Sequence, residues 1–360
     1  MDADIFPLPD FEIASGTLKR LKRITLSIAR GAGAFTLARK SRWRQRRLLI
    51  LCYHGVSLHD EHCWDSDLFI SPDRFARRME ILKRRKYNVL SLDEGLARLA
   101  KDDLPPASVA ITFDDGLFCF YKTALPILES QQFTSVLYLT TYYSEVQEPV
   151  FNVACPYILW KARNGTLKTA ALTGTDQEFD LAREDHRRAA WNEITRFVQD
   201  NRISASEKNH LMAQVSAQVG FDWERLRESR IFTLMTPVEV SDASRRGVSI
   251  ELHTHRHRTP MDRPLFLREI DDNRQRIEAM TGRSPKHFCY PSGVYHPEFL
   301  PWLAERGVVS ATTCDPGLTL GTTPPLLAPR LVDITSLNDT EFEGWLCGLS
   351  SLLPMKTLRH

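Results

Sequence analysis

Two short segments far apart in the chain carry the side chains best suited to hold a metal ion. Residues 112–116 read Thr-Phe-Asp-Asp-Gly, and residues 253–257 read His-Thr-His-Arg-His. His253 and His257 are four residues apart, so they can lie on one face of a single turn. With one carboxylate they form a set that suits a divalent transition metal and leaves coordination positions open, which is typical of catalytic sites.

The two adjacent carboxylates are expected to do different work. Successive side chains diverge as a strand ends, so we assign Asp115 to the metal and Asp114 to the base that takes a proton from the attacking water. Taken singly, Asp-Asp-Gly is more often a turn, and His-x-x-x-His is often an accident of a polar surface. Their joint placement favours a metal site. His255 points away from the shared face by its spacing and is interpreted as a solvated or packing histidine.

Each motif follows an apolar run that is typical of a buried strand. Residues 108–111 lead into the first motif, and residues 248–252 lead into the second. Both motifs would therefore lie at the carboxyl ends of strands, the edge at which parallel α/β folds place their chemistry.

From residue 47 onward, strand and helix patterns alternate, which predicts a parallel sheet or barrel. Besides the two strands before the motifs, the predicted strands are 48–54, 87–92, 134–140, 287–291, 308–314 and 330–334. The predicted helices are 72–86, 93–104, 121–131, 236–247, 264–281, 297–306 and 340–350. Residues 145–230 break the alternation with charged, mainly helical sequence, and we interpret them as a helical insertion near the mouth of the site.

These motifs resemble those of the polysaccharide deacetylases with the NodB homology domain. The likeness covers most of residues 47–335. Residues 53–56, Tyr-His-Gly-Val, resemble the Tyr-His-x-Val segment of a subgroup whose catalytic histidine lies at the amino end, and residues 288–293, Phe-Cys-Tyr-Pro-Ser-Gly, resemble the third motif of the family. The resemblance implies a distorted (β/α) barrel of about seven units. It also implies a metal-dependent hydrolase that removes the acetyl group from an N-acetylated sugar in a polysaccharide, an oligosaccharide or a lipid-linked glycan precursor.

The resemblance also implies roles for single residues, with Zn²⁺ as the expected metal. His54 would protonate the leaving amine, since an imidazole titrates near neutrality. It also ends an apolar strand, so a core histidine with a satisfied ring is the alternative. A backbone N–H near Ser292 would stabilise the oxyanion, because Ser292 replaces the aromatic residue that often follows the proline of this motif.

One departure from the family concerns the partner of the base. The third motif usually offers an arginine that pairs with the base aspartate, and Cys289 stands at the comparable place. Arg330 could supply the missing cation, because a guanidinium holds a carboxylate bidentately. A surface arginine that caps a strand is the alternative. Two other functions therefore stay open, namely hydrolysis of another amide such as a cyclic ureide or imide, and a catalytically silent glycan-binding module.

Composition indicates a soluble enzyme-sized chain. Its 360 residues, 42% of them hydrophobic, can bury a full core. There is no apolar stretch of eighteen residues, and the start of the chain is acidic without a secretory pattern. The seven cysteines include no Cys-x-x-Cys pair, and an odd number cannot all pair within one chain, which indicates a reduced compartment. We expect a cytoplasmic protein.

The positive charge is concentrated near the N-terminus. Residues 17–47 contain eleven Lys or Arg and no acid, so we divide the chain into a basic extension, 1–46, and a deacetylase-like barrel, 47–360. Apolar residues recur through this segment at roughly helical spacing: Leu18, Leu21, Ile28 and Phe35. This predicts an amphipathic helix, interrupted near Gly31 and Gly33, that binds an anionic membrane surface. A loosely packed, solvated leader is the alternative. Nucleic-acid binding is not expected, because nothing resembles a reading motif.

Overall fold

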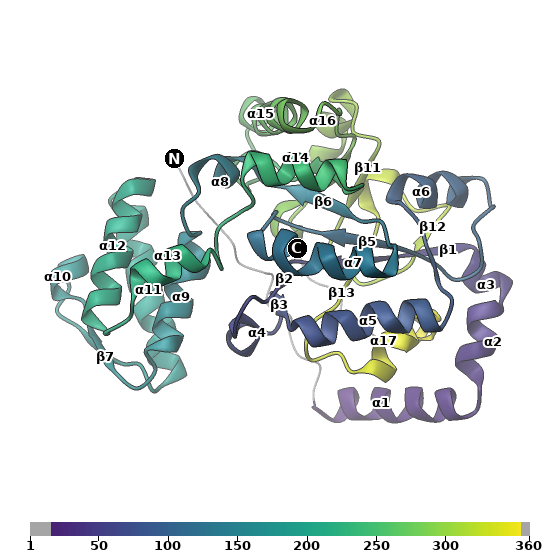
Figure 1. Ribbon diagram of the computed structural model, residues 1–360, viewed down its shortest axis with the longest axis horizontal. Coiled ribbons are helices and arrows are strands. Elements are labelled where there is room, and N and C mark those ends of the chain that lie inside the picture. Colours follow the sequence, from purple (N-terminus) through teal and green to yellow (C-terminus); the bar gives the residue numbers. More distant parts are fainter. Residues whose placement is uncertain (1–15, 354–360) are drawn as a thin grey trace.

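The computed structural model describes residues 16–353 and contains one large, curled, mostly parallel sheet (Figure 1). Seven strands follow one another in parallel in the order β11-β10-β9-β6-β5-β1-β13. Their bounds are β1 Arg47–Tyr53, β5 Ser108–Phe113, β6 Val136–Leu139, β9 Ser249–Leu252, β10 His287–Cys289, β11 Ser310–Thr312 and β13 Leu331–Val332. A parallel bridge from Thr312 to Ala328 draws β11 toward the segment before β13. The predicted α/β barrel is therefore confirmed.

Helices cover the sheet on its outer side, as the alternation of patterns predicts (Figure 1). They are α5 Pro72–Arg84, α6 Leu92–Ala100, α7 Leu125–Gln131, α14 Pro237–Arg245, α15 Arg263–Thr281, α16 Phe299–Glu305 and α17 Asp339–Leu346. Capping residues determine where these helices begin and end. The side chains of Thr236 and Glu239 exchange hydrogen bonds with each other's backbone N–H at the start of α14, and Gly282, with φ +69°, ends α15.

Three local predictions need correction. The strand predicted at 87–92 is only β4, Asn88–Val89, because Ser91 already caps α6. β4 pairs with β5 on the edge opposite to β1. The loop predicted at 316–329 contains a short strand, β12 Thr319–Leu320, antiparallel to β1. The helix predicted at 121–131 begins with a π-helical turn, Phe120–Ala124, where Pro126 offers no N–H to continue a regular α-helical ladder backward.

The chain between β6 and α14 forms a mainly helical lobe, seen at the left of Figure 1. It consists of α8 Thr141–Val146, α9 Phe151–Lys161, β7 Thr166–Lys168, α10 Ala170–Thr173, β8 Glu178–Asp180, α11 Glu184–Asp200, α12 Ala205–Gln218 and α13 Trp223–Ser229. Its side chains make a hydrophobic core separate from that of the barrel. Leu68 and Phe69, beside the strand pair β2 Gly55–Val56 and β3 Phe69–Ile70, join this second core. The lobe is therefore anchored close to the carboxyl end of β1.

The basic segment folds onto the barrel as α1 Gly16–Gly31, α2 Ala34–Lys40 and α3 Arg42–Gln45. The predicted interruption is present, since α1 ends at Gly31. Leu26 and Phe35 pack with Cys347 after α17, and two ion pairs reinforce this contact: Arg23 with Glu341 at 3.0 Å and Arg30 with Glu343 at 2.7 Å. Within residues 16–353, no helix has the length and apolar character needed to cross a membrane.

Candidate active site

The two predicted motifs meet at the carboxyl edge of the sheet. Asp114 and Asp115 follow β5, His253 follows β9, and only β6 separates these strands. Because all three strands run parallel, their carboxyl ends lie at the same edge. Residues more than a hundred positions apart are thereby brought into one buried group.

Asp115, His253 and His257 form a set that fits a divalent metal ion. Nε2 of each histidine lies 3.3 Å from Oδ1 of Asp115, and all three side chains are buried. Nδ1 of His253 lies 2.9 Å from the carbonyl oxygen of Cys289, to which it donates. This bond orients the ring so that its other nitrogen, Nε2, faces Asp115, and Nε2 is the atom that such an imidazole would present to a metal ion.

Charge balance favours the ionised form of Asp115. Burial raises the pKa of this carboxyl, but hydrogen bonds from His253 and His257 outweigh that effect and hold its pKa well below the ordinary value. A buried carboxylate with two imidazoles directed at it has the donor types that zinc and similar ions prefer.

Asp114 is held by a buried arginine. Nη1 and Nη2 of Arg330 each lie 2.7 Å from one oxygen of Asp114, and the guanidinium is fully buried. Burial raises the pKa of Asp114, but the charge of Arg330 outweighs it and lowers this pKa to about 2. Asp114 is therefore ionised at neutral pH. The alternative of Arg330 as a surface cap is wrong, because β13 and its approach carry this side chain into the interior.

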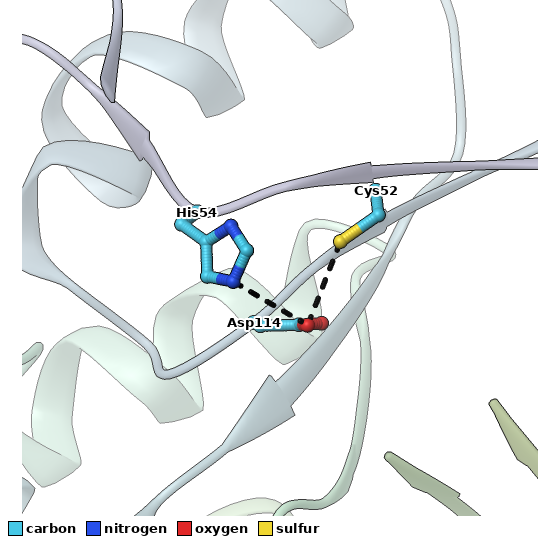
Figure 2. Close-up of side chains that lie close together, drawn as sticks. All are labelled: Cys52, His54 and Asp114. Carbon is cyan, nitrogen blue, oxygen red and sulfur yellow. Dashed lines mark hydrogen bonds and ion pairs between the residues drawn. The ribbon is translucent and has the colours of Figure 1, made fainter. Parts of the chain in front are cut away.

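Three thiols, those of Cys52, Cys289 and Cys314, surround this ion pair. Sγ of Cys289 lies 3.0 Å from Nη2 of Arg330, and Sγ of Cys52 lies 3.5 Å from Oδ2 of Asp114 (Figure 2). Cys314 lies 3.7 Å from the same guanidinium nitrogen. Burial raises the pKa of all three thiols, so they stay neutral. Cys289, which stands where the family usually has an arginine, thus contacts the arginine that approaches from another strand.

His54 completes the group from the end of β1. Its Nε2 lies 3.8 Å from Oδ2 of Asp114 (Figure 2). The ring lines the same cavity as the metal-site residues. Only 8% of the side chain is exposed, yet Nδ1 has no hydrogen-bond partner within the described part of the chain. The alternative of a core histidine with a satisfied ring therefore does not describe His54.

The cavity at this edge is narrow. Its volume is about 60 Å³, and ten residues line it: His54, Asp65, Leu68, Asp114, Asp115, His253, His257, Ser292, Gly293 and Cys314. A water molecule needs roughly 10–15 Å³ of such space, so the cavity has room for a few waters or for a small group such as acetyl. A whole sugar ring must remain outside it.

Three residues in the walls of the cavity have a left-handed backbone conformation. Asp115, His257 and Ser292 have φ values of +70°, +54° and +55°, a region that costs a non-glycine residue about 1–3 kcal/mol. Such strain is typical of functional sites, where the surrounding fold enforces it. Ser292, the predicted oxyanion residue, follows β10 and lies on the cavity wall beside Gly293.

Some features of the site were not visible in the sequence. Asp65, in the turn after α4 Glu61–Trp64, lines the cavity, and its Oδ1 accepts hydrogen bonds from the N–H groups of Asp67 and Leu68. No motif indicates this residue. His255, in contrast, packs as expected: its Nδ1 lies 2.9 Å from Oγ1 of Thr141, and burial together with nearby arginines lowers its pKa to about 3.

Comparison with known families agrees with this geometry. A family model described as "Polysaccharide deacetylase" matches residues 101–311, which is more than half of the chain. The chain belongs to the polysaccharide deacetylase family. The matched range contains Asp114, Asp115 and both metal-site histidines, whereas His54 and Arg330 lie on either side of it.

Solved structures of deacetylases share the fold of this family member. The PplD deacetylase of Streptococcus pyogenes, solved in complex with acetate, is 17% identical, with a TM-score of 0.54 over 82% of this chain and 96% of that one. IcaB from Ammonifex degensii is 16% identical, with a TM-score of 0.53 over 84% of this chain and 98% of that one. At these identities the likeness establishes the fold. A search of curated proteins finds no match.

Proposed function

We propose that this family member is a metal-dependent hydrolase that removes the acetyl group from an N-acetylated sugar of a glycan. The observation that carries the proposal is the buried arrangement of Asp115, His253 and His257 next to the ion pair of Asp114 and Arg330. Ligands for a metal and a separate ionised carboxylate within one narrow cavity are what metal-assisted hydrolysis of an amide by water requires.

Zn²⁺ is the ion that we propose for the site. Two imidazoles and one carboxylate leave coordination positions open for water and substrate, as in catalytic zinc sites. When bound, the ion would supply Lewis-acid activation of water and of the acetyl carbonyl.

The residues around the ligands would carry the proton transfers. Asp114, ionised and held by Arg330, accepts a proton from the attacking water. His54 ends β1, the strand that lies between β5 and β13, and donates a proton to the nitrogen of the leaving amine. The backbone N–H of Ser292 donates to the oxygen on which negative charge develops.

Acetate release tests this proposal. The purified protein is incubated with N-acetylglucosamine oligomers, peptidoglycan fragments and lipid-linked N-acetylated sugars, before and after removal of metal by a chelator. We expect acetate from at least one glycan, loss of release in the chelated protein, and recovery on addition of Zn²⁺. Asp114→Asn is the matched inactive control. Release from a cyclic ureide or imide alone would contradict the proposal, and binding of glycan without any release would favour the silent module.

We further propose that the protein works in the cytoplasm, attached peripherally to the inner face of the membrane. The support comes from α1 and α2, which bury one face on the barrel and expose the other. Five large apolar side chains are exposed there: Leu18, Leu21, Ile24, Ile28 and Leu37. Exposed basic side chains lie among them, including Arg20, Lys40 and Arg42. An apolar stripe with basic neighbours suits the surface of an anionic bilayer.

Some basic residues of this segment are not available to bind lipid. Arg44 is fully buried and donates to backbone carbonyls of Leu346 and Ser108, so it is unavailable to lipid. Arg23 and Arg30 are paired with acids of α17. Attraction would therefore come from fewer basic residues than the eleven in the sequence, at about 1 kcal/mol each close to the surface, together with insertion of the exposed apolar side chains.

A further inference from the structure

We propose that a groove on the helical lobe, lined by Trp64, Trp160 and Trp191, binds further sugar residues of the glycan whose acetylated sugar occupies the active site. This inference rests on the proposed deacetylase function. It assigns the substrate class, an oligosaccharide or polysaccharide chain rather than a single sugar.

The groove lies between α4, α9 and α11 and has a volume of about 440 Å³. Three of the chain's seven tryptophans line it, and each is half-buried. This size falls within the range of about 300–1,000 Å³ that is typical of ligand sites. Three tryptophan rings around one open groove combine apolar faces with N–H donors, and such residues are enriched at binding interfaces.

The chemistry of the lining suits a pyranose chain. Each pyranose ring presents a face of C–H groups, which packs on the negative face of an aromatic ring, while its hydroxyls point outward to polar partners. Glu184, Arg187 and Arg188 lie in the same groove and provide both acceptors and donors for hydroxyls. Arg187 is already oriented by hydrogen bonds to the carbonyl oxygens of Leu181 and Ala182.

The tryptophan rings are held in place by other aromatic residues. Trp64 packs edge-on against Tyr157 at 5.6 Å between ring centroids, and Trp160 lies 5.8 Å from the same Tyr157. Trp191 lies 5.5 Å from Phe151. Because little side-chain freedom remains to be lost, such a platform can bind a ligand at a low entropic cost.

The groove adjoins the active site through one short segment. Trp64 is the last residue of α4, and the next residue, Asp65, lines the catalytic cavity together with Leu68. The cavity itself is too narrow for a sugar ring, so the sugars on either side of the acetylated one must lie outside it. Asp65 and Trp64 are consecutive residues, so the cavity and the groove are lined from the same turn.

The test compares substrates of different length. Acetate release is measured with N-acetylglucosamine oligomers of two and of six sugars, for the wild type, Trp160→Ala and Trp191→Ala. We expect each variant to raise KM for the hexamer about tenfold, the loss expected for one stacked ring, with little change in kcat and little change for the dimer. Trp191→Phe should restore most of the loss. Trp302→Ala, which removes a partly buried tryptophan from the barrel, is the matched control and should leave the ratio of hexamer to dimer unchanged.

A binding measurement separates this inference from the proposed function. The hexamer is titrated calorimetrically into the full-length, zinc-loaded Asp114→Asn protein with and without Trp191→Ala. About tenfold weaker binding with Trp191→Ala supports the groove even if no oligomer releases acetate, in which case only the proposed function fails. Equal binding by the two proteins, no binding by either, or equal effects on dimer and hexamer would overturn the groove.

Discussion

At the scale of single residues, the metal set and the base are separable. Asp115, His253 and His257 direct their polar atoms at one point, whereas Asp114 directs both oxygens at Arg330. Loss of a metal ligand and loss of the base should therefore have different consequences, although the two aspartates are neighbours in the chain.

We predict that His253→Ala and His257→Ala purify with at least tenfold less bound zinc than the wild type, because an open three-ligand site loses affinity steeply with one ligand. Asp114→Asn should keep its zinc and lose turnover by at least a hundredfold. Elemental analysis and acetate release give the two readouts. Full zinc and full activity in all three variants would place the site elsewhere.

His54 gives a second prediction at this scale. If its ring protonates the leaving amine, His54→Ala should lower kcat by about 10²–10⁴ and leave zinc content and KM nearly unchanged. The alkaline limb of the pH profile should also disappear. An active His54→Ala protein with an unchanged profile would return His54 to a packing role.

The pairing of Arg330 with Asp114 predicts a rescue. Arg330→Ala should abolish turnover and destabilise the fold by about 3–5 kcal/mol, since it leaves a buried carboxylate unpaired. Cys289→Arg, added to Arg330→Ala, returns a guanidinium from the position that the family uses and should restore part of both. Urea unfolding and acetate release of the single and double variants test this. No recovery in a folded double variant would show that the two positions are not interchangeable.

At the scale of elements, a buried network fixes the strand that carries His54. Tyr53, the last residue of β1, donates to Asp333 at 2.9 Å, and Arg78 of α5 donates to the same carboxylate at 3.0 Å. Arg78 also pairs with Asp339 at 2.7 Å. The network thus ties β1, α5 and the chain after β13 together at the residue that precedes His54.

Arg78→Met should cost about 3–5 kcal/mol of unfolding free energy at neutral pH, because Asp333 is left buried without its cation. Burial raises the pKa of Asp333 and Arg78 opposes this, so the variant raises that pKa further. A carboxyl whose pKa is higher in the folded than in the unfolded state destabilises the fold when it is ionised, and this penalty disappears when it is protonated. The loss of stability in Arg78→Met should therefore shrink as the pH falls toward 3.8, the ordinary pKa of an aspartate. Urea unfolding at several pH values measures this change.

Arg77→Met is the matched control for that experiment. Arg77 pairs with the same Asp339, but its side chain is 64% exposed, so its removal should cost less than about 1 kcal/mol. Equal losses for the two variants, or a loss for Arg78→Met that does not depend on pH, would contradict the role of the buried network.

At the scale of the whole molecule, one apolar surface, on α1 and α2, is exposed. Among the described residues, the exposed large apolar side chains of α1 and α2 form the group that lies opposite the face packed on α17. Deleting this segment would also remove Leu26 and Phe35 and so uncover Cys347, against which they pack. Substitutions on the exposed face are therefore the better test of membrane binding.

We predict that Leu21→Ser with Ile28→Ser weakens binding to vesicles of phosphatidylglycerol and phosphatidylcholine at least tenfold, since two apolar side chains no longer enter the bilayer. Binding of the wild type should also fall as salt screens the basic residues. Co-sedimentation measures both effects. Val238→Ser with Val309→Ser, two exposed valines elsewhere, is the control. Equal binding by all proteins, or by none, would contradict the membrane role.

The sequence by itself determined the fold class and the core of the site. The strand runs before Asp114 and His253 and the spacing of His253 and His257 are local features, so a periodic pattern and a short motif are enough to predict them. The ends of α14 and α15 follow from capping residues for the same reason. The sequence did not predict features that depend on neighbouring elements of the fold. β4 is short because α6 begins directly after it, and β12 forms where it can pair with the start of β1.

Only the tertiary structure decided how distant residues meet. The bond between Arg330 and Asp114 joins residues 216 positions apart, and Asp65 reaches the cavity from the turn after α4 although no motif marks it. Two basic residues of the N-terminal helix, Arg23 and Arg30, likewise pair with acids of α17. Such contacts leave no periodic pattern in the sequence, because they join residues that are far apart in the chain. Their energy comes from burial and pairing across the fold, and it depends on distances that a single sequence does not contain.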